Sequence, residues 1–197
     1  MATDTTTNKC PLNLQKSLDW CQGVPELPGI KAKVYYINSQ AVLGYPSLPR
    51  DEQGRATGST LTGNFVLAEG AKFKHIDHLP SKAQVQTETQ GEIPSQTIKT
   101  TLTIVYPGVG SAASDIVPSL LNQDNIFLVE DMKGKIRVVY SPIYHDSVAT
   151  VAQDLGQGAT GTTGTTIVIT ASDEVSLPTY TGKIETDEGT INDTTGA

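Results

Sequence analysis

The sequence NIFLVEDMKGKIRVVYS, residues 125–141, says most about how this chain folds. Two apolar runs rich in β-branched residues, NIFLVED and KIRVVYS, flank the short segment MKG. Such runs favour strands, and a short connection that contains glycine is typical of a β-hairpin. We therefore predict two antiparallel strands joined by a turn at Gly134.

Further strands are predicted on both sides of this hairpin. They lie at residues 31–37, in two short segments of 61–78 with a turn at Glu69–Gly70, and at residues 84–89, 95–106, 145–152, 166–172 and 179–186. In residues 95–106, Ile98, Leu102 and Ile104 share one face, as alternation in a strand requires. Residues 84–89 also alternate, but neither face is strongly apolar. We expect that strand to contact a partner or to line a wet surface.

The best helix candidate is SAASDIVPSLLNQ, residues 111–123. Ser114 is its predicted N-cap, and Pro118 is tolerable there because it lies early in the helix. Many strands against one helix predict a mainly β (α+β) fold. We expect an antiparallel β-sandwich or barrel-like sheet pair with one flanking α-helix, an N-terminal arm and a long loop.

Composition supports a β-rich chain with a modest core. Of 197 residues, 26 are Thr, 18 are Gly and 11 are Pro, a mixture that favours strands and turns. Apolar residues make up 37%, so we expect a core that is not buried on every side. The formal net charge is −7, and a basic surface for gripping phosphates is therefore not expected.

The chain divides into three predicted parts. Residues 1–29 form an N-terminal arm, residues 30–186 a β domain with an interaction loop at 38–60, and residues 187–197 a polar, frayed tail. The start of the sequence lacks the pattern of an export signal, and no apolar run is long enough for a membrane helix. Cys10 and Cys21 are then expected as reduced thiols, with a disulfide in the arm as the alternative.

Four motifs and one set of carboxylates could carry chemistry, and each has a plainer interpretation. The carboxylates are Glu130, Asp131, Asp173 and Glu174, which could act as general acids but lie next to turns, where Asp and Glu are common. Gly108–Ala113 fits G-x-G-x-x-A, but no second αβ unit follows it, so a strand-to-helix turn is favoured over dinucleotide binding. The glycines of 156–164 lack the lysine of a phosphate-binding loop. His75 and His78 point to opposite faces of a strand, and His145 beside Asp146 has no nucleophile in a suitable context. We therefore predict no catalytic residue, cofactor or metal, and no enzyme.

The order of elements from residue 82 to residue 186 resembles the tail-tube (major tail) protein family of bacteriophages, including Bacteroides-type phage and prophage structural proteins. The segments that carry the resemblance are EIPSQTIKTTLTIVYPG, a short helix, LLNQDNIFLVEDMKGKIRVVY, a Gly/Thr-rich stretch and TIVITASDEVSLPTYTGKIET. The resemblance implies a homo-oligomeric ring, commonly a hexamer, that stacks into a tube. It also implies a location in the virion after assembly in the bacterial host cytoplasm. DNA would pass through the tube without specific binding, and other tail or neck proteins would be partners.

Under this hypothesis, candidate subunit or ring contacts come from the arm, the loop and the closing strand. They are Trp20, Arg50, Asp51, Glu52, Arg55 and Tyr180. A capsid decoration protein or a neck or connector protein of a phage would share the same composition. A β-rich binding module for carbohydrate would need an exposed aromatic platform, and the only tryptophan lies in the arm. An enzyme acting through the Gly108 turn has the least support.

Overall fold

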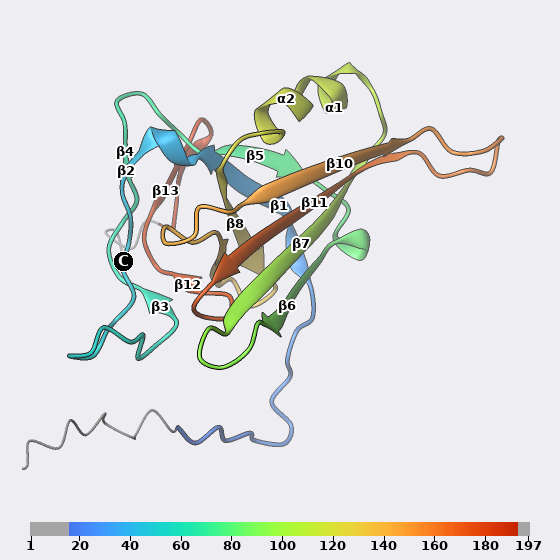
Figure 1. Ribbon diagram of the computed structural model, residues 1–197. Coiled ribbons are helices and arrows are strands. Elements are labelled where there is room, and N and C mark those ends of the chain that lie inside the picture. The colour runs from blue at the N-terminus through green and yellow to red at the C-terminus, as the bar shows by residue number, and fades with distance from the viewer. Residues whose placement is uncertain (1–15, 193–197) are drawn as a thin grey trace, which may run out of the picture.

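The computed structural model describes residues 16–192 and contains two main sheets (Figure 1). A six-stranded sheet has the order β3-β12-β9-β8-β1-β5, and a four-stranded sheet has the order β10-β11-β7-β6. The strands of the first sheet are β1 (Ile30–Asn38), β3 (Thr60–Leu61), β5 (Lys74–Asp77), β8 (Asn125–Asp131), β9 (Ile136–Val139) and β12 (Thr179–Tyr180). Those of the second are β6 (Gln84–Gln90), β7 (Thr97–Pro107), β10 (Val148–Asp154) and β11 (Gly164–Asp173). All pairs are antiparallel except β12 with β3.

The fold is therefore mainly β and sandwich-like, as predicted. Two small pairs, β2 (Val42–Gly44) with β4 (Val66–Leu67) and β13 (Ile184–Thr186) with β14 (Gly189–Ile191), add to the main sheets. The remaining elements are the short helices α1 (Ser111–Asp115) and α2 (Val117–Leu120) and the 3-10 turns η1 (Ser39–Ala41) and η2 (Pro80–Lys82). The hairpin predicted around Gly134 is confirmed as β8 and β9, with Gly134 at a φ of 82° in the turn.

Strand β8 lies at the centre of the molecule and is buried on both faces. Phe127 and Val129 pack into the core between the two main sheets. Ile126 and Leu128 point the other way, into a second core beneath the six-stranded sheet. The expectation of a core not buried on every side is wrong for this strand, because its apolar residues run without alternation.

The first core fills the sandwich between the two main sheets. In the register of the four-stranded sheet, Leu102 lies opposite Ile169 and Ile104 opposite Ile167, and all four are buried. The alternation predicted for residues 95–106 is confirmed, since Leu102 and Ile104 share the inner face of β7. Leu120 of α2 closes this core from the side.

The second core covers the opposite face of the six-stranded sheet and is rich in aromatic side chains. Phe65 contacts both Phe73 and Tyr180, with ring centroids 5.8 Å and 5.0 Å apart. The backbone N–H of Phe65 donates to the Tyr180 hydroxyl, which donates in turn to the carbonyl of Lys183. Tyr180 is only 1% exposed, so its proposed role as a subunit contact is wrong.

The predicted last strand, residues 179–186, is broken at Gly182 into β12 and β13. A Cβ atom at Gly182 would lie 2.4 Å from Asn64 Oδ1 and 2.5 Å from the Tyr180 hydroxyl oxygen. Real Cβ atoms do not approach other atoms so closely, and both neighbours are held by hydrogen bonds. The Tyr-Thr-Gly pattern at 180–182 is thus a packing motif, in which glycine leaves room for the tyrosine ring.

The helix prediction is only partly correct. Two short helices meet at Ile116 in place of one helix over 111–123, and Gly110 occupies the N-cap position predicted for Ser114. Pro118 is the cause, because its ring would conflict with the carbonyl of Ser114 in a continuous helix. That carbonyl accepts instead from the N–H of Ile116, which ends α1.

The predicted loop and tail contain more structure than expected. Residues 38–60 include η1, β2 and an isolated bridge between Arg50 and Ala56. The tail prediction is wrong for Gly189–Ile191, which forms β14 and pairs with β13. Residues 193–197 and the first half of the arm, including Cys10, lie outside the described residues. Cys21 is exposed.

We predict that Gly182→Ala lowers the free energy of unfolding by about 1–3 kcal/mol, because the added methyl group overpacks the Tyr180 site. Urea denaturation followed by circular dichroism measures the change. Gly110→Ser is the matched control, since Gly110 has an ordinary φ of −68°, an added Cβ there would meet open space, and serine is favoured at the N-cap position that Gly110 occupies. Equal stability of the two variants would contradict the packing role of Gly182.

Candidate functional site

The four-stranded sheet ends in two strands that pair on one side only. Within residues 16–192, no further strand pairs with the outer side of β6 or of β10. Both strands are largely exposed, and Val148 at the start of β10 is 54% exposed. Such edges present unpaired backbone N–H and C=O groups, which can pair with another strand. The prediction that residues 84–89 contact a partner or face water fits the position of β6 at the edge.

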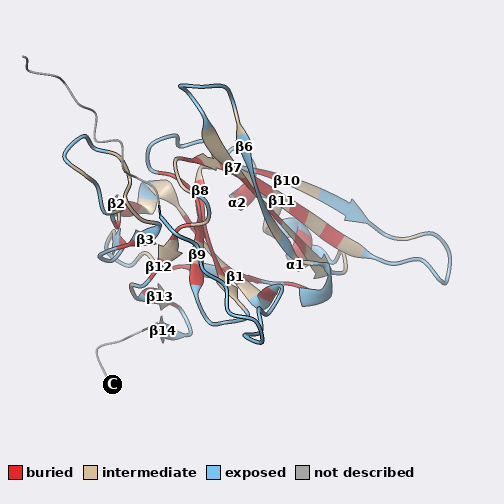
Figure 2. Ribbon diagram, turned by 90° about the horizontal axis from the view of Figure 1, so that it is seen from below, coloured by how far each residue is buried: buried red, intermediate tan, exposed pale blue. Residues whose placement is uncertain are grey.

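The outer face of the four-stranded sheet is made up of exposed and partly buried residues (Figure 2). Its side chains are mostly polar but carry little charge. Residues on this face alternate with the buried ones in the register of the sheet. They are Gln84, Gln86, Glu88, Gln90, Thr97, Lys99, Thr101, Thr103, Val105, Val148, Thr150, Ala152, Asp154, Thr166, Val168, Thr170 and Ser172. The Lys99 ammonium lies 3.5 Å from a Glu88 carboxylate oxygen, so the only cation of this face is paired. A surface of this kind offers little grip on phosphate groups.

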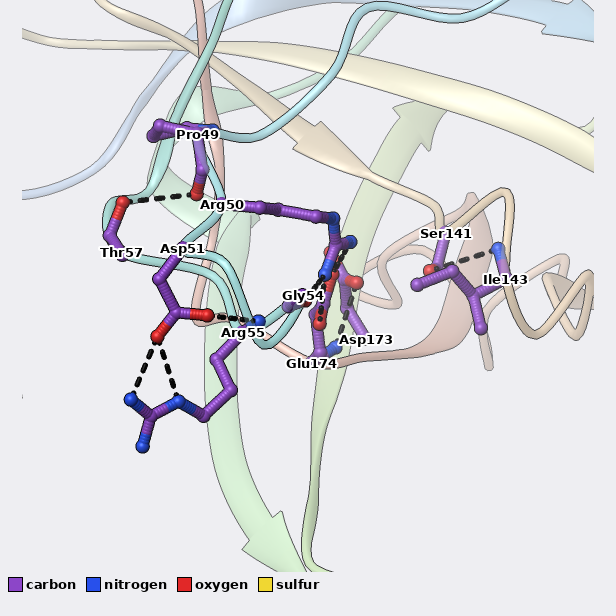
Figure 3. Close-up of polar contacts among 10 residues, drawn as sticks. All are labelled: Pro49, Arg50, Asp51, Gly54, Arg55, Thr57, Ser141, Ile143, Asp173 and Glu174. Carbon is purple, nitrogen blue, oxygen red and sulfur yellow. Dashed lines mark hydrogen bonds and ion pairs between the residues drawn. The ribbon is translucent and has the colours of Figure 1, made fainter. Parts of the chain in front are cut away.

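The predicted interaction loop is held together by its own charged residues (Figure 3). The Asp51 carboxylate accepts hydrogen bonds from the backbone N–H groups of Gln53 and Arg55 and from the Arg55 guanidinium. Arg50 donates to the Gly54 carbonyl and to both carboxylate oxygens of Glu174. Arg50, Asp51 and Arg55 therefore fold the loop and fasten it to the residue after β11.

The remaining predicted contacts are exposed. Glu52 lies at the tip of the same turn. Trp20 lies in the arm and is 72% exposed. Arg50 is also exposed, whereas Asp51 and Arg55 are half-buried. The structure brings Arg50, Asp51, Glu52 and Arg55 together in one loop, and it places Trp20 and Tyr180 apart from them.

Beside this loop lies a cavity of about 240 Å³, here called the loop pocket. Its walls are mostly apolar and aromatic. Its polar lining includes Arg50 and Glu174, which pair with each other. The residues used below are Tyr45, Arg50, Tyr140, Ile143, Asp173 and Glu174. Asp173 was assigned an ordinary position next to a turn, but strict alternation in TIVITASD places it on the inner face with Ile167, Ile169 and Ala171.

Asp173 is a buried carboxyl group in this pocket, with only 8% of its surface exposed. It accepts a hydrogen bond from the Glu174 backbone N–H and another from the Ser141 hydroxyl. Burial raises the pKa of the Asp173 carboxyl to about 6, and the charge of Glu174 acts in the same direction. The two hydrogen bonds and the charge of Arg50 oppose this shift without cancelling it.

A second polar cluster joins Asp124, Tyr140 and His145. The Tyr140 hydroxyl donates to Asp124 at 2.9 Å and lies 2.6 Å from His145 Nδ1, which is 3.2 Å from the same carboxylate. The acid beside the imidazole is thus Asp124, whereas Asp146 accepts from the N–H of Ser172. Among residues 16–192, no hydrogen bond joins the other ring nitrogen of His145 to a hydroxyl or thiol. The cluster therefore anchors the segment after β9 and lacks a nucleophile.

The other sequence motifs have structural roles. Gly108, at a φ of 102°, turns the chain into α1, and Asp131 accepts hydrogen bonds from the N–H groups of Lys133 and Lys135 in the β8–β9 turn. The glycine-rich residues 155–163 form the tip of the projecting β10–β11 hairpin (Figure 1). His78 is buried and His75 half-buried. No group of three or more His, Cys, Asp or Glu side chains in residues 16–192 could hold a metal ion.

Comparison of the chain with protein family models, with characterised proteins and with solved structures finds no match. In the part of the chain that the structure describes, no helix has the length and apolar character needed to cross a membrane.

We predict that the ionisation of Asp173 lowers the free energy of unfolding as the pH rises from about 4 to about 6. Between the ordinary carboxyl pKa of 3.8 and the raised value of about 6, the folded state holds a proton on Asp173 that the unfolded state has lost. The loss amounts to about 3 kcal/mol at most. Asp173→Asn removes this dependence. Its stability relative to the wild type is therefore expected to be higher at pH 7 than at pH 4.

Urea denaturation at pH 4, 5, 6 and 7 measures this difference. Asp115→Asn, which removes an exposed carboxylate from α1, is the control for the loss of one negative charge. Parallel stability curves for the wild type and Asp173→Asn across this range would contradict the predicted titration.

Proposed function

We propose that this chain is a virion structural protein that assembles into rings, which stack into a phage tail tube through which DNA passes. The observation that carries the proposal is the four-stranded sheet with a one-sided strand at each edge. Pairing of β6 in one copy with β10 in the next would continue the sheet around a ring. The resemblance of residues 82–186 to tail-tube proteins supports the same assembly.

The strand directions favour such head-to-tail pairing. Each neighbouring pair in the order β10-β11-β7-β6 is antiparallel, so β6 runs opposite to β10. When identical copies are placed side by side, β10 of the next copy therefore meets β6 in the antiparallel sense. When a contact between two different surfaces is repeated from copy to copy, it closes into a ring if the rotation between neighbouring copies divides a full turn into a whole number of steps. Both edges of the four-stranded sheet, which would otherwise invite aggregation, are then paired.

The outer face of this sheet supports passage of DNA. In a closed ring, the face opposite the sandwich core is free to line the lumen. Its side chains are mainly threonine and glutamine, and its single lysine is paired with Glu88. Phosphate backbones are held chiefly by lysine and arginine, so DNA would slide past this surface without being retained.

Edge variants test the proposal. Gln84→Lys with Gln86→Lys blocks β6, and Thr150→Lys with Ala152→Lys blocks β10, because lysines on an edge oppose strand addition. We expect the wild type to form rings or tubes at tens of micromolar and each blocked variant to stay monomeric. An equimolar mixture should give dimers, since each partner retains one intact edge. Negative-stain electron microscopy and sedimentation velocity measure the products.

Thr101→Lys with Thr103→Lys is the matched control, because it adds the same charges to the same face on the interior strand β7. This control should assemble as the wild type does. A wild type that stays monomeric at every concentration, or blocked variants that assemble normally, would contradict the proposal.

A further inference from the structure

The N-terminal arm carries large apolar side chains that nothing in the described structure covers. Leu18 and Trp20 are 99% and 72% exposed, and Val24 and Leu27 are each more than half exposed. Residues 16–29 form no helix or strand and run away from the sandwich below β6 and β7 (Figure 1). Several exposed apolar residues in one short segment mark an interaction site.

The loop pocket has the size and the chemistry for one large aromatic side chain. Its volume of about 240 Å³ is below the roughly 300 Å³ at which sites for drug-sized ligands begin. Tyr45 and Tyr140, whose rings stack with centroids 6.0 Å apart, contribute aromatic walls. Ile143, which also lines the pocket, is 54% exposed.

The polar groups of the pocket match the single donor of an indole ring. Asp173 and Glu174 both line the cavity. Their carboxyl oxygens already accept from Arg50, the Glu174 N–H and Ser141, and each oxygen has a second lone pair that can accept a further hydrogen bond. A buried tryptophan needs one acceptor for its ring N–H and apolar contact for the rest of the ring. Trp20 is the only tryptophan of the chain. From these features we infer that Trp20 of one copy inserts into the loop pocket of a second copy.

A second copy is the occupant because the arm of the same chain is already placed beside the loop without filling the pocket. The Lys16 ammonium donates to the carbonyl of Thr57, on the loop that carries Arg50. Trp20, four residues further on, nevertheless stays exposed. The inference rests on the proposed function, since stacked rings would bring the arm of one subunit to the loop of another. The insertion of Trp20 would be the contact that links these two subunits.

The fluorescence of Trp20 tests the inference directly, because no other tryptophan contributes. We expect its emission maximum to shift to shorter wavelength as the wild type assembles. Ile143→Arg, which places a charge at the pocket, should abolish the shift, whereas Ile93→Arg at a site that is 85% exposed should preserve it. Trp20→Ala should raise the concentration needed for tube formation about tenfold or more, as for a buried tryptophan anchor.

Mixing separates docking between copies from docking within one chain. Trp20→Ala retains the pocket and Ile143→Arg retains the tryptophan, so an equimolar mixture should recover the shift if the contact joins two copies. A shift that is independent of concentration and is not recovered on mixing would overturn the inference. Tubes that form with unshifted Trp20 emission would overturn it while leaving the proposed function standing. Absence of any assembly would overturn both.

Discussion

The structure depends on burying both faces of one strand, β8. Its side chains alternate between the sandwich core and the aromatic core beneath the six-stranded sheet, so a single strand links two separate hydrophobic clusters. Burial of each large apolar side chain contributes about 1.5–3 kcal/mol. Strands β1 and β9 hydrogen bond to β8 on either side, and the four-stranded sheet and the loop after β2 each cover one of its faces.

Sequence reasoning was reliable where the pattern was local. Alternation located β7, and the glycine between two apolar runs located the β8–β9 turn. It failed where distant residues decide the outcome. Tyr180 resembled a surface residue of a closing strand, but its cover comes from Phe65, more than a hundred residues earlier. The Arg50–Glu174 pair joins residues that are similarly far apart in the sequence, so the residues around each of them do not predict it.

The candidate site was predicted only in outline. The arm and the charged loop were predicted as separate segments, but the residue types could not distinguish side chains that are paired within the subunit from side chains that are exposed. Asp51 and Arg55 satisfy each other within one turn, whereas Trp20 has no such partner nearby and remains exposed. The open edges of the four-stranded sheet depend on strand order, which is fixed by pairings between segments far apart in the chain.

The parallel pairing of β3 with β12 has a consequence for biosynthesis. Leu61 finds its partner only when Tyr180 has been made, about 120 residues later. At a synthesis rate of about 5–20 residues per second, this delay is roughly 6–24 s. During that time the aromatic core beneath β8 lacks Tyr180 and Ile184, so the nascent chain is incomplete on one side. The aromatic core of a subunit is therefore completed only after residues 180–184 have been synthesised.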